Sequence, residues 1–237
     1  MARVLVTRPQ PGAQTTAGKL RLLGHEPIVL PLSEVRALTA VFPDAAAVDA
    51  VAITSANAVR FLPRQEIIRL ADKPCFAVGE RTARAASDAG FADVRASGGD
   101  GEDLAGLIAS RMRRGSRVLY PCGRVRRPEF EAALASAAIR CVAIEVYDTV
   151  FPDIDPRVLR PLLGDSPPDV ALVYSARSAR ALYRLVATGG ASPCFQTTLF
   201  FCLSQQVADA LGTIDPSRIY CSDEPSEDAL LARLPAA

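Results

Sequence analysis

Small polar residues recur where apolar, strand-like runs of the sequence give way to helical patterns. Six such turns follow one another along the chain: Thr7-Arg8, Thr54-Ser55, Gly79-Glu80, Pro121-Cys122-Gly123, Tyr174-Ser175 and Ser204-Gln205. Ligands of parallel α/β sheets bind outside the carboxyl ends of the strands, where free N–H groups of the following helices attract carboxylates or phosphates. Ser and Thr also cap ordinary helices. The repetition of these turns therefore supports the prediction of a cleft rich in anion sites.

Other kinds of chemistry find little support in the motifs. No turn matches the G-x-G-x-x-G pattern or the P-loop, which disfavours nucleotide binding. His25 is the only histidine and has no nearby ligand partners, so a metal site and Ser-His or Cys-His catalysis are largely excluded. Six cysteines occur without a C-x-x-C pair and are predicted to be buried thiols. We expect no metal and no cofactor.

The composition indicates a folded protein without a strong long-range electrostatic field. Of 237 residues, 49% are hydrophobic and 22% are charged, and the formal net charge is +1. A balanced charge gathers neither nucleic acid nor anionic membrane, so we expect neither as a partner. The first apolar stretch is too short for a signal peptide, and no later one approaches the ~20 residues that span a bilayer. We expect a cytoplasmic monomer.

The elements that position these turns alternate between short β-branched runs and amphipathic helices. Phe130, Ala133, Leu134 and Ala137 share one helical face, and the same spacing recurs from Ala179 to Val186. Alternation of this kind is typical of parallel sheets covered by helices. The turn at residues 97–101, SGGDG, precedes another helix and is either a simple loop or a close backbone approach to a ligand.

The chain also resembles itself. VAITSANAVRFL at residues 51–62 matches ALVYSARSARAL at 171–182, and two further strand–turn–helix units follow each copy in the same order. Upstream of each copy, RVLVTRP with PIVLPL corresponds to RVLYPCGR with CVAIEVY. A duplication A-B-A′-B′ predicts two domains of about five strands each. Periodicity leaves open whether A pairs with B or with B′, and an interleaved arrangement is compatible with the four prolines in residues 153–168.

VLVTRP, ITSANAV, AVGERTA, VLYPCG followed by VYDT, and YSARSA together resemble bacterial uroporphyrinogen-III synthases over nearly the whole chain. The resemblance implies two similar parallel-sheet, three-layer α/β domains, flavodoxin- or Rossmann-like and interleaved in sequence. The first would comprise residues 1–35 plus 152–237 and the second residues 36–151. A linker of two strands, near residues 33–38 and 145–151, would join them.

The same resemblance implies an activity in tetrapyrrole (haem) biosynthesis. These enzymes cyclise the linear tetrapyrrole hydroxymethylbilane, a substrate with eight carboxylates, with inversion of ring D and loss of water, and they need no cofactor. Two other classes stay open from the residues alone. These are a two-lobed binding protein and a nucleotide-sugar transferase-like enzyme, each acting on a small anionic ligand.

Site residues follow from the resemblance position by position. Tyr147 matches a tyrosine that assists departure of the hydroxyl group, although it could be a packed linker residue, and Thr82 matches a threonine at the cleft, although it could be a surface residue of a helix. Asn57 stands where some relatives carry arginine, and Val207 where many carry a small hydroxyl residue. The full set of expected substrate-binding residues is Arg8, Thr54, Ser55, Asn57, Gly79, Thr82, Cys122, Gly123, Ser175, Ala176, Arg177, Ser204, Gln206 and Val207.

Overall fold

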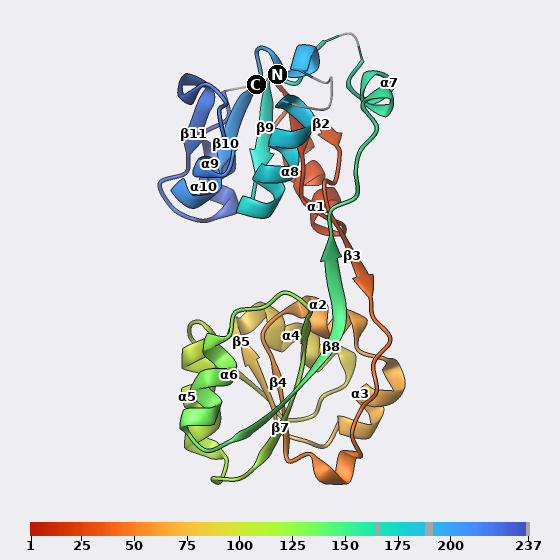
Figure 1. Ribbon diagram of the computed structural model, residues 1–237, viewed down its shortest axis with the longest axis vertical. Helices are drawn as coiled ribbons and strands as arrows, with labels where there is room; N and C mark the ends of the chain where they lie inside the picture. Colours follow the sequence, from red (N-terminus) through yellow and green to blue (C-terminus); the bar gives the residue numbers. More distant parts are fainter. Residues whose placement is uncertain (165, 188–191, 236–237) are drawn as a thin grey trace. The chain divides into compact units, whose positions relative to one another are not determined.

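The short apolar runs of the sequence form strands in two separate sheets (Figure 1). The structure is a computed structural model, and it describes residues 1–164, 166–187 and 192–235. The chain divides into two units, Met1–Val35 with Val150–Ala237 and Arg36–Thr149. The first unit is thus assembled from both ends of the chain, whereas the second is one continuous segment.

The sheet of the first unit has five strands in the order β11-β10-β9-β1-β2, and neighbouring strands pair in parallel. Its strands are β1 (Arg3–Val6), β2 (Glu26–Val29), β9 (Val170–Val173), β10 (Leu199–Cys202) and β11 (Ile219–Cys221). In chain order this is the doubly wound order 2-1-3-4-5. The pairing of β1 with β9 joins the amino-terminal segment to the carboxyl-terminal third.

Helices cover both faces of this sheet: α1 (Gly12–Leu22), α7 (Leu159–Leu163), α8 (Ala176–Ala187), α9 (Gln205–Asp209) and α10 (Glu227–Ala232). Neighbouring strand residues point to opposite faces, so Leu5 packs in one buried cluster and Val4 in another. The first cluster takes its helical residues from α7, α8 and α9, and the second from α1 and α10. The unit therefore has three layers.

The sheet of the second unit has six strands in the order β3-β8-β7-β4-β5-β6. Its strands are β3 (Glu34–Ala37), β4 (Ala50–Ile53), β5 (Cys75–Val78), β6 (Val94–Ser97), β7 (Arg117–Gly123) and β8 (Arg140–Val150). Pairings from β8 to β6 are parallel, and the arrow of β3 runs opposite to that of β8 in Figure 1. The internal repeat predicts about five strands in each domain. β3 is the sixth strand of this sheet, and it lies where the resemblance implies the first linker strand, near residues 33–38. β3 and the end of β8 carry the chain from one unit into the other.

The second sheet is also buried on both faces. The helices α2 (Ala56–Phe61), α3 (Arg64–Leu70) and α4 (Gly79–Ala89) pack with Val51 and Ile53 on one face. On the other face α5 (Gly101–Arg111) and α6 (Glu129–Ser136) pack with Ala50 and Phe76. Short 3₁₀ turns occur at Ala45–Ala47, Pro156–Val158, Ser192–Phe195 and Pro216–Arg218. In the described ranges no helix has the length and apolar character needed to cross a membrane.

Equivalent strands have the same spatial order in the two sheets, although they follow one another in a different order along the chain. The order β2-β1-β9-β10-β11 in the first matches β8-β7-β4-β5-β6 in the second, unit for unit with the internal repeat. A therefore pairs with B′, and A′ with B. Because the chain enters the second sheet at β4, the second unit is a circularly permuted version of the first.

Candidate active site

A pocket opens in the second unit at the point where the strand order reverses. β4 and β7 are neighbours there but are followed by helices on opposite faces of the sheet, which leaves a crevice at their carboxyl ends. The pocket has a volume of about 510 Å³. Its lining consists of Thr54, Ser55, Val78, Asp100, Gly101, Glu102, Tyr120, Val125, Arg126, Arg127, Glu129, Phe130 and Tyr147.

Thr54 and Tyr120 form the floor of the crevice. Thr54 Oγ1 and the Tyr120 hydroxyl share a hydrogen bond of 2.9 Å between β4 and β7. The Tyr120 ring packs edge-on against Phe130, with centroids 4.8 Å apart. Burial raises the pKa of Tyr120 to about 12, although the hydrogen bond with Thr54 works in the other direction. Tyr120 is therefore a neutral, fixed phenol in the physiological range.

Tyr147 reaches the pocket because β8 carries a bulge. Cys122 pairs with Glu145 but Gly123 pairs with Tyr147, so Val146 is an extra residue in the ladder. The Tyr147 ring stacks against Phe61, with centroids 6.0 Å apart. Burial raises the pKa of Tyr147, and a side-chain hydrogen bond with Ser55 opposes that shift. The half-buried phenol thus keeps its proton at neutral pH and can donate it.

The amino termini of α2 and α5 at the pocket are already capped. Ser55 Oγ accepts a hydrogen bond from Asn57 N at 3.2 Å. Asp100 Oδ1 accepts from Glu102 N at 2.9 Å and from Asp103 N at 3.3 Å, completing a capping box. At α5 the Asp100 carboxylate occupies the first N–H groups of the helix, so the turn at residues 97–101 does not offer them to an anion.

Two arginines after β7 supply the positive charge of the pocket. Arg126 is held by Glu131 at 2.7 Å and by Glu145 at 3.1 Å, and the hydrogen bond with Glu131 is the main reason that its pKa is raised. Arg127 is exposed and has no ion-pair partner among the residues that the structure describes. Sequence reasoning missed both residues, although the run RVRRPE directly after a strand end was a visible signal.

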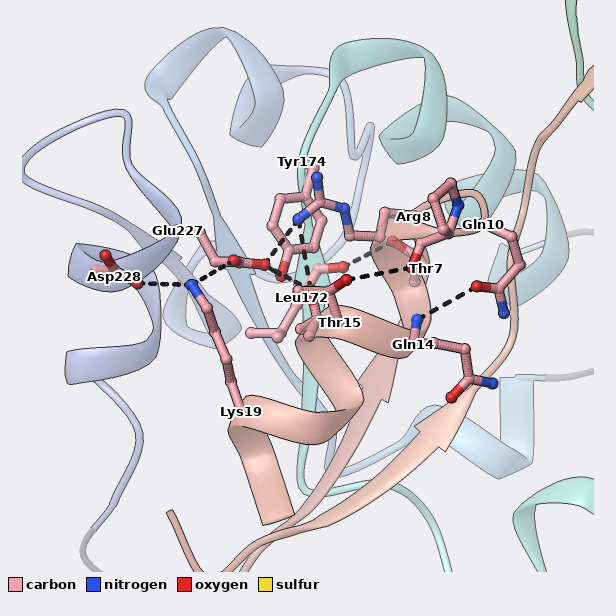
Figure 2. Close-up of polar contacts among 12 residues, drawn as sticks. Thr7, Arg8, Gln10, Gln14, Thr15, Lys19, Leu172, Tyr174, Glu227 and Asp228 are labelled. Carbon is pink, nitrogen blue, oxygen red and sulfur yellow. Dashed lines mark hydrogen bonds and ion pairs between the residues drawn. The ribbon is translucent and has the colours of Figure 1, made fainter. Parts of the chain in front are cut away.

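The corresponding place in the first unit is filled by a charged network (Figure 2). The Glu227 carboxylate forms ion pairs with Arg8 Nη1 at 2.7 Å and with Lys19 Nζ at 2.8 Å. The Arg8 guanidinium also lies 4.6 Å from the centroid of the Tyr174 ring. Thr16 and Tyr174 also donate hydroxyl hydrogen bonds to Glu227. Burial disfavours the ionised carboxylate of Glu227, but hydrogen bonds from Lys19 and Thr16 outweigh it and lower its pKa. Arg8 is thus neutralised within its own unit.

The comparison with protein families decides what this scaffold belongs to. Residues 14–232 match the family described as uroporphyrinogen-III synthase HemD. The chain belongs to the uroporphyrinogen-III synthase family. A comparison with curated proteins found no match.

Solved uroporphyrinogen-III synthases have a similar structure. The uroporphyrinogen-III synthetase of Helicobacter pylori 26695 has a TM-score of 0.69 at 18% identity, covering 98% of this chain and 97% of that chain. A mutant uroporphyrinogen III synthase of Thermus thermophilus has a TM-score of 0.52 at 19% identity, covering 98% of this chain and 96% of that chain. The likeness confirms the predicted fold class of two interleaved α/β domains.

Three residues suggested by the resemblance to uroporphyrinogen-III synthases, Thr54, Ser55 and Tyr147, line the pocket. Of the described residues, Asn57, Gly79, Thr82, Cys122 and Gly123 lie outside its lining. Thr82 is buried in α4, and Gly79 begins that helix with a φ of +68°. Cys122 is buried and donates to the Ile144 carbonyl at 3.5 Å, and burial raises the pKa of its thiol to about 11.

In the first unit the residues expected from the uroporphyrinogen-III synthase resemblance lie at the starts of α8 and α9. Ser175 Oγ accepts from Ser178 N at 3.1 Å, and Ala176 begins α8. The Arg177 guanidinium lies 4.6 Å from the centroid of the Phe151 ring. Ser204 precedes α9, where Gln206 is exposed and Val207 is buried in the core. Val207 can therefore offer a ligand only its backbone.

The Glu227 network makes a prediction about stability. Replacing Glu227 with Gln leaves Arg8 and Lys19 without their carboxylate and should lower the free energy of unfolding by roughly 2 kcal/mol at pH 7. Because the pKa of Glu227 is lowered on folding, its contribution is present above about pH 4.3 and is lost as pH falls through the folded pKa. Urea unfolding at pH 7 and at progressively lower pH measures the difference in free energy of unfolding between the parental protein and Glu227→Gln. This difference should become smaller as the pH falls. Glu224→Gln, at an exposed side chain nearby, is the control, and equal stability of the two variants at pH 7 would contradict the assignment.

Proposed function

We propose that this chain is a uroporphyrinogen-III synthase that cyclises hydroxymethylbilane with inversion of ring D and loss of water. The observation that carries the proposal is the half-buried phenol of Tyr147 in the pocket of the second unit. The family match over residues 14–232 supplies the substrate class. The pocket is formed by one unit, and the residues that make it are positioned by the sheet.

The first chemical step is the departure of the hydroxyl group. Tyr147 donates its proton to the hydroxyl oxygen while the pyrrole nitrogen of the terminal ring supplies the electron pair, so that the C–O bond breaks and water leaves. The product of this step is a cationic azafulvene. Ring D attacks the azafulvene through its substituted α-carbon and forms a spiro intermediate. The bond from that carbon to the neighbouring methylene carbon then breaks, the methylene carbon bonds to the free α-carbon of ring D, and the proton lost from this carbon restores the phenol. Because burial raises its pKa, the phenol carries its proton throughout the neutral range before the hydroxyl group leaves.

Binding of the substrate relies on its carboxylates. In the pocket Arg127 is the guanidinium best able to take one, because Arg126 is already shared by Glu131 and Glu145. Glu102 and Glu129 stand in the same lining and repel carboxylates, which restricts where an acidic side arm can lie. The pocket therefore orients the substrate as well as holding it.

Further substrate contacts are proposed for residues at the other strand ends and helix starts. Ser175, Ser204 and Gln206 can contact substrate through their side chains, and Ala176 through its backbone. Arg177 can do so once it turns from Phe151. Cys122 and Val207 contribute through backbone groups, since both side chains are buried. Arg8 acts through the Glu227 network.

The chain would act as a cytoplasmic monomer on a small-molecule substrate, with neither nucleic acid nor membrane as a partner. The formal net charge of +1 supports the exclusion of nucleic acid and anionic membrane, because only local groups are available to attract anions.

The activity is tested with freshly prepared hydroxymethylbilane. Spontaneous closure gives the isomer without ring inversion, isomer I, so the protein should convert most of the substrate to isomer III. Separation of the porphyrin isomers after oxidation measures the ratio. A ratio no higher than in a protein-free reaction would reject the proposed activity.

Tyr147→Phe tests the proton donor. The variant keeps the ring beside Phe61 but loses the hydroxyl, so kcat should fall about 100-fold, at the low end for a general acid, with KM little changed. Steady-state kinetics on isomer III formation gives both constants. Tyr220→Phe, on the edge strand β11, is the matched control and should retain the parental kcat. Unchanged kcat in Tyr147→Phe would remove the residue from the mechanism.

Arg127→Gln tests carboxylate binding. Loss of one charge-assisted hydrogen bond should raise KM at least about tenfold while kcat changes little. Arg64→Gln, an exposed arginine on α3 outside the lining, should leave KM unchanged. The difference between the two variants should shrink in high salt. Equal KM values for both variants would show that Arg127 binds no carboxylate.

A further inference from the structure

Gly123, the last residue of β7, lies against the ring of Tyr147. A Cβ atom at Gly123 would be 2.8 Å from both Cε2 and Cζ of Tyr147 and 3.0 Å from its hydroxyl oxygen. Non-bonded carbon atoms are normally about 3.5–4.0 Å apart, so such a contact is strongly repulsive. With any side chain at position 123, the ring of Tyr147 or the end of β7 must move.

The backbone conformation of Gly123 does not require glycine. Six glycines of the described residues have positive φ, Gly79 among them, and Gly123 does not belong to that set. An alanine could adopt the backbone of Gly123 without left-handed strain. Glycine is therefore needed at this position to make room for the Tyr147 ring, and not to allow a special backbone conformation.

The bulge at Val146 turns Tyr147 toward the pocket. In a regular strand Val142, Ile144 and Val146 would face one side and Tyr147 the other. All four pack against the same buried cluster, because the extra residue interrupts the alternation. Arg124 N donates to the Tyr147 carbonyl at 2.9 Å directly after the bulge, which fixes the backbone of Tyr147 to the chain that follows Gly123.

We propose that Gly123 is a positioning residue for Tyr147: the bulge turns the phenol toward the pocket, and the missing side chain at Gly123 lets it sit at the depth from which it reaches the hydroxyl group of the substrate. The inference rests on the function proposed for Tyr147. It assigns Gly123 no contact with substrate, in contrast to the binding role that the sequence suggested. A small displacement of a catalytic group is enough to slow chemistry strongly without weakening binding.

Gly123→Ala tests the proposal through kinetics. The variant should lower kcat about 10- to 100-fold while KM stays within about twofold, because the phenol moves and the carboxylate contacts do not. Gly106→Ala, in α5 where a Cβ meets no atom within 4 Å, is the matched control and should keep the parental kcat. In a Tyr147→Ala background, which removes the ring, the same Gly123→Ala change should alter kcat less than about twofold. A loss of equal size in both backgrounds would overturn the proposal.

A second measurement does not depend on activity. In protein labelled at tyrosine Cζ with carbon-13, the resonance of Tyr147 is identified by its absence from Tyr147→Phe, and its pH titration reports the pKa. In Gly123→Ala the displaced ring becomes more exposed, so its pKa should fall toward the ordinary value, whereas Gly106→Ala should leave it raised. An unchanged titration would overturn the positioning role. A parental protein that fails to form isomer III would reject the enzyme assignment, and the titration would still decide whether Gly123 sets the position of the phenol.

Thermal unfolding covers the case in which Gly123→Ala is too unstable to assay. If the defect is the clash with the ring, Gly123→Ala combined with Tyr147→Ala should have the Tm of Tyr147→Ala alone, which supports the proposal. The proposal would be overturned if Gly123→Ala lowered the Tm of Tyr147→Ala by as much as it lowers the Tm of the parental protein.

Discussion

The parallel pairing of β4 with β7 is the constraint on which the candidate site depends. These strands lie far apart in sequence, and their hydrogen bonds place the turns after Ile53 and Gly123 side by side. Because the chain leaves β4 toward one face and β7 toward the other, neither of the helices that follow covers the carboxyl ends between them. Thr54, Tyr120 and Tyr147 meet in that gap, and the two arginines after β7 border it. If this pairing were lost, the residues would have no common location.

The same scaffold has been used in two ways within one chain. Tyr174 stands in the first unit where Thr54 stands in the second, according to the internal repeat. The larger side chain carries the Arg8 guanidinium on its ring and hydrogen-bonds Glu227, so the space at the first switch point is closed by an internally neutral network. In the second unit the smaller Thr54 and the exposed Arg127 leave space and charge for a ligand. The two equivalent strand-end positions of the repeat therefore differ in what occupies them: a charged network in the first unit and a pocket in the second.

Much of the scaffold follows from sequence pattern, because periodicity and internal repetition survive without knowledge of packing. The strands, the two similar halves and the placement of Ser55 and Thr54 after β4 are readable in this way. Cys122 was expected in the site because it lies at the end of a strand, but the alternation of side chains in β7 turns it into the core. Val207 was expected there from the family resemblance, but it lies on the buried face of α9. Arg126 and Arg127 lie in a turn without periodicity, and only the three-dimensional pairing brings them to the pocket. The bulge at Val146 is a register change of one residue, which arises from tertiary packing and leaves no mark in composition or spacing.

The circular permutation of the second unit has a consequence for synthesis on the ribosome. Each strand from β4 to β8 has been translated before β9 begins, so the middle of the chain can complete its parallel core while the carboxyl-terminal third is still being made. The first two strands cannot complete their sheet at that stage, because β1 pairs on its inner side with β9, which has not yet been synthesised. During that interval Val4, Leu5 and Val6, fully buried in the finished fold, lack the partners that β9 and the carboxyl-terminal helices supply. The amino-terminal segment is therefore the part of the nascent chain most in need of protection from aggregation.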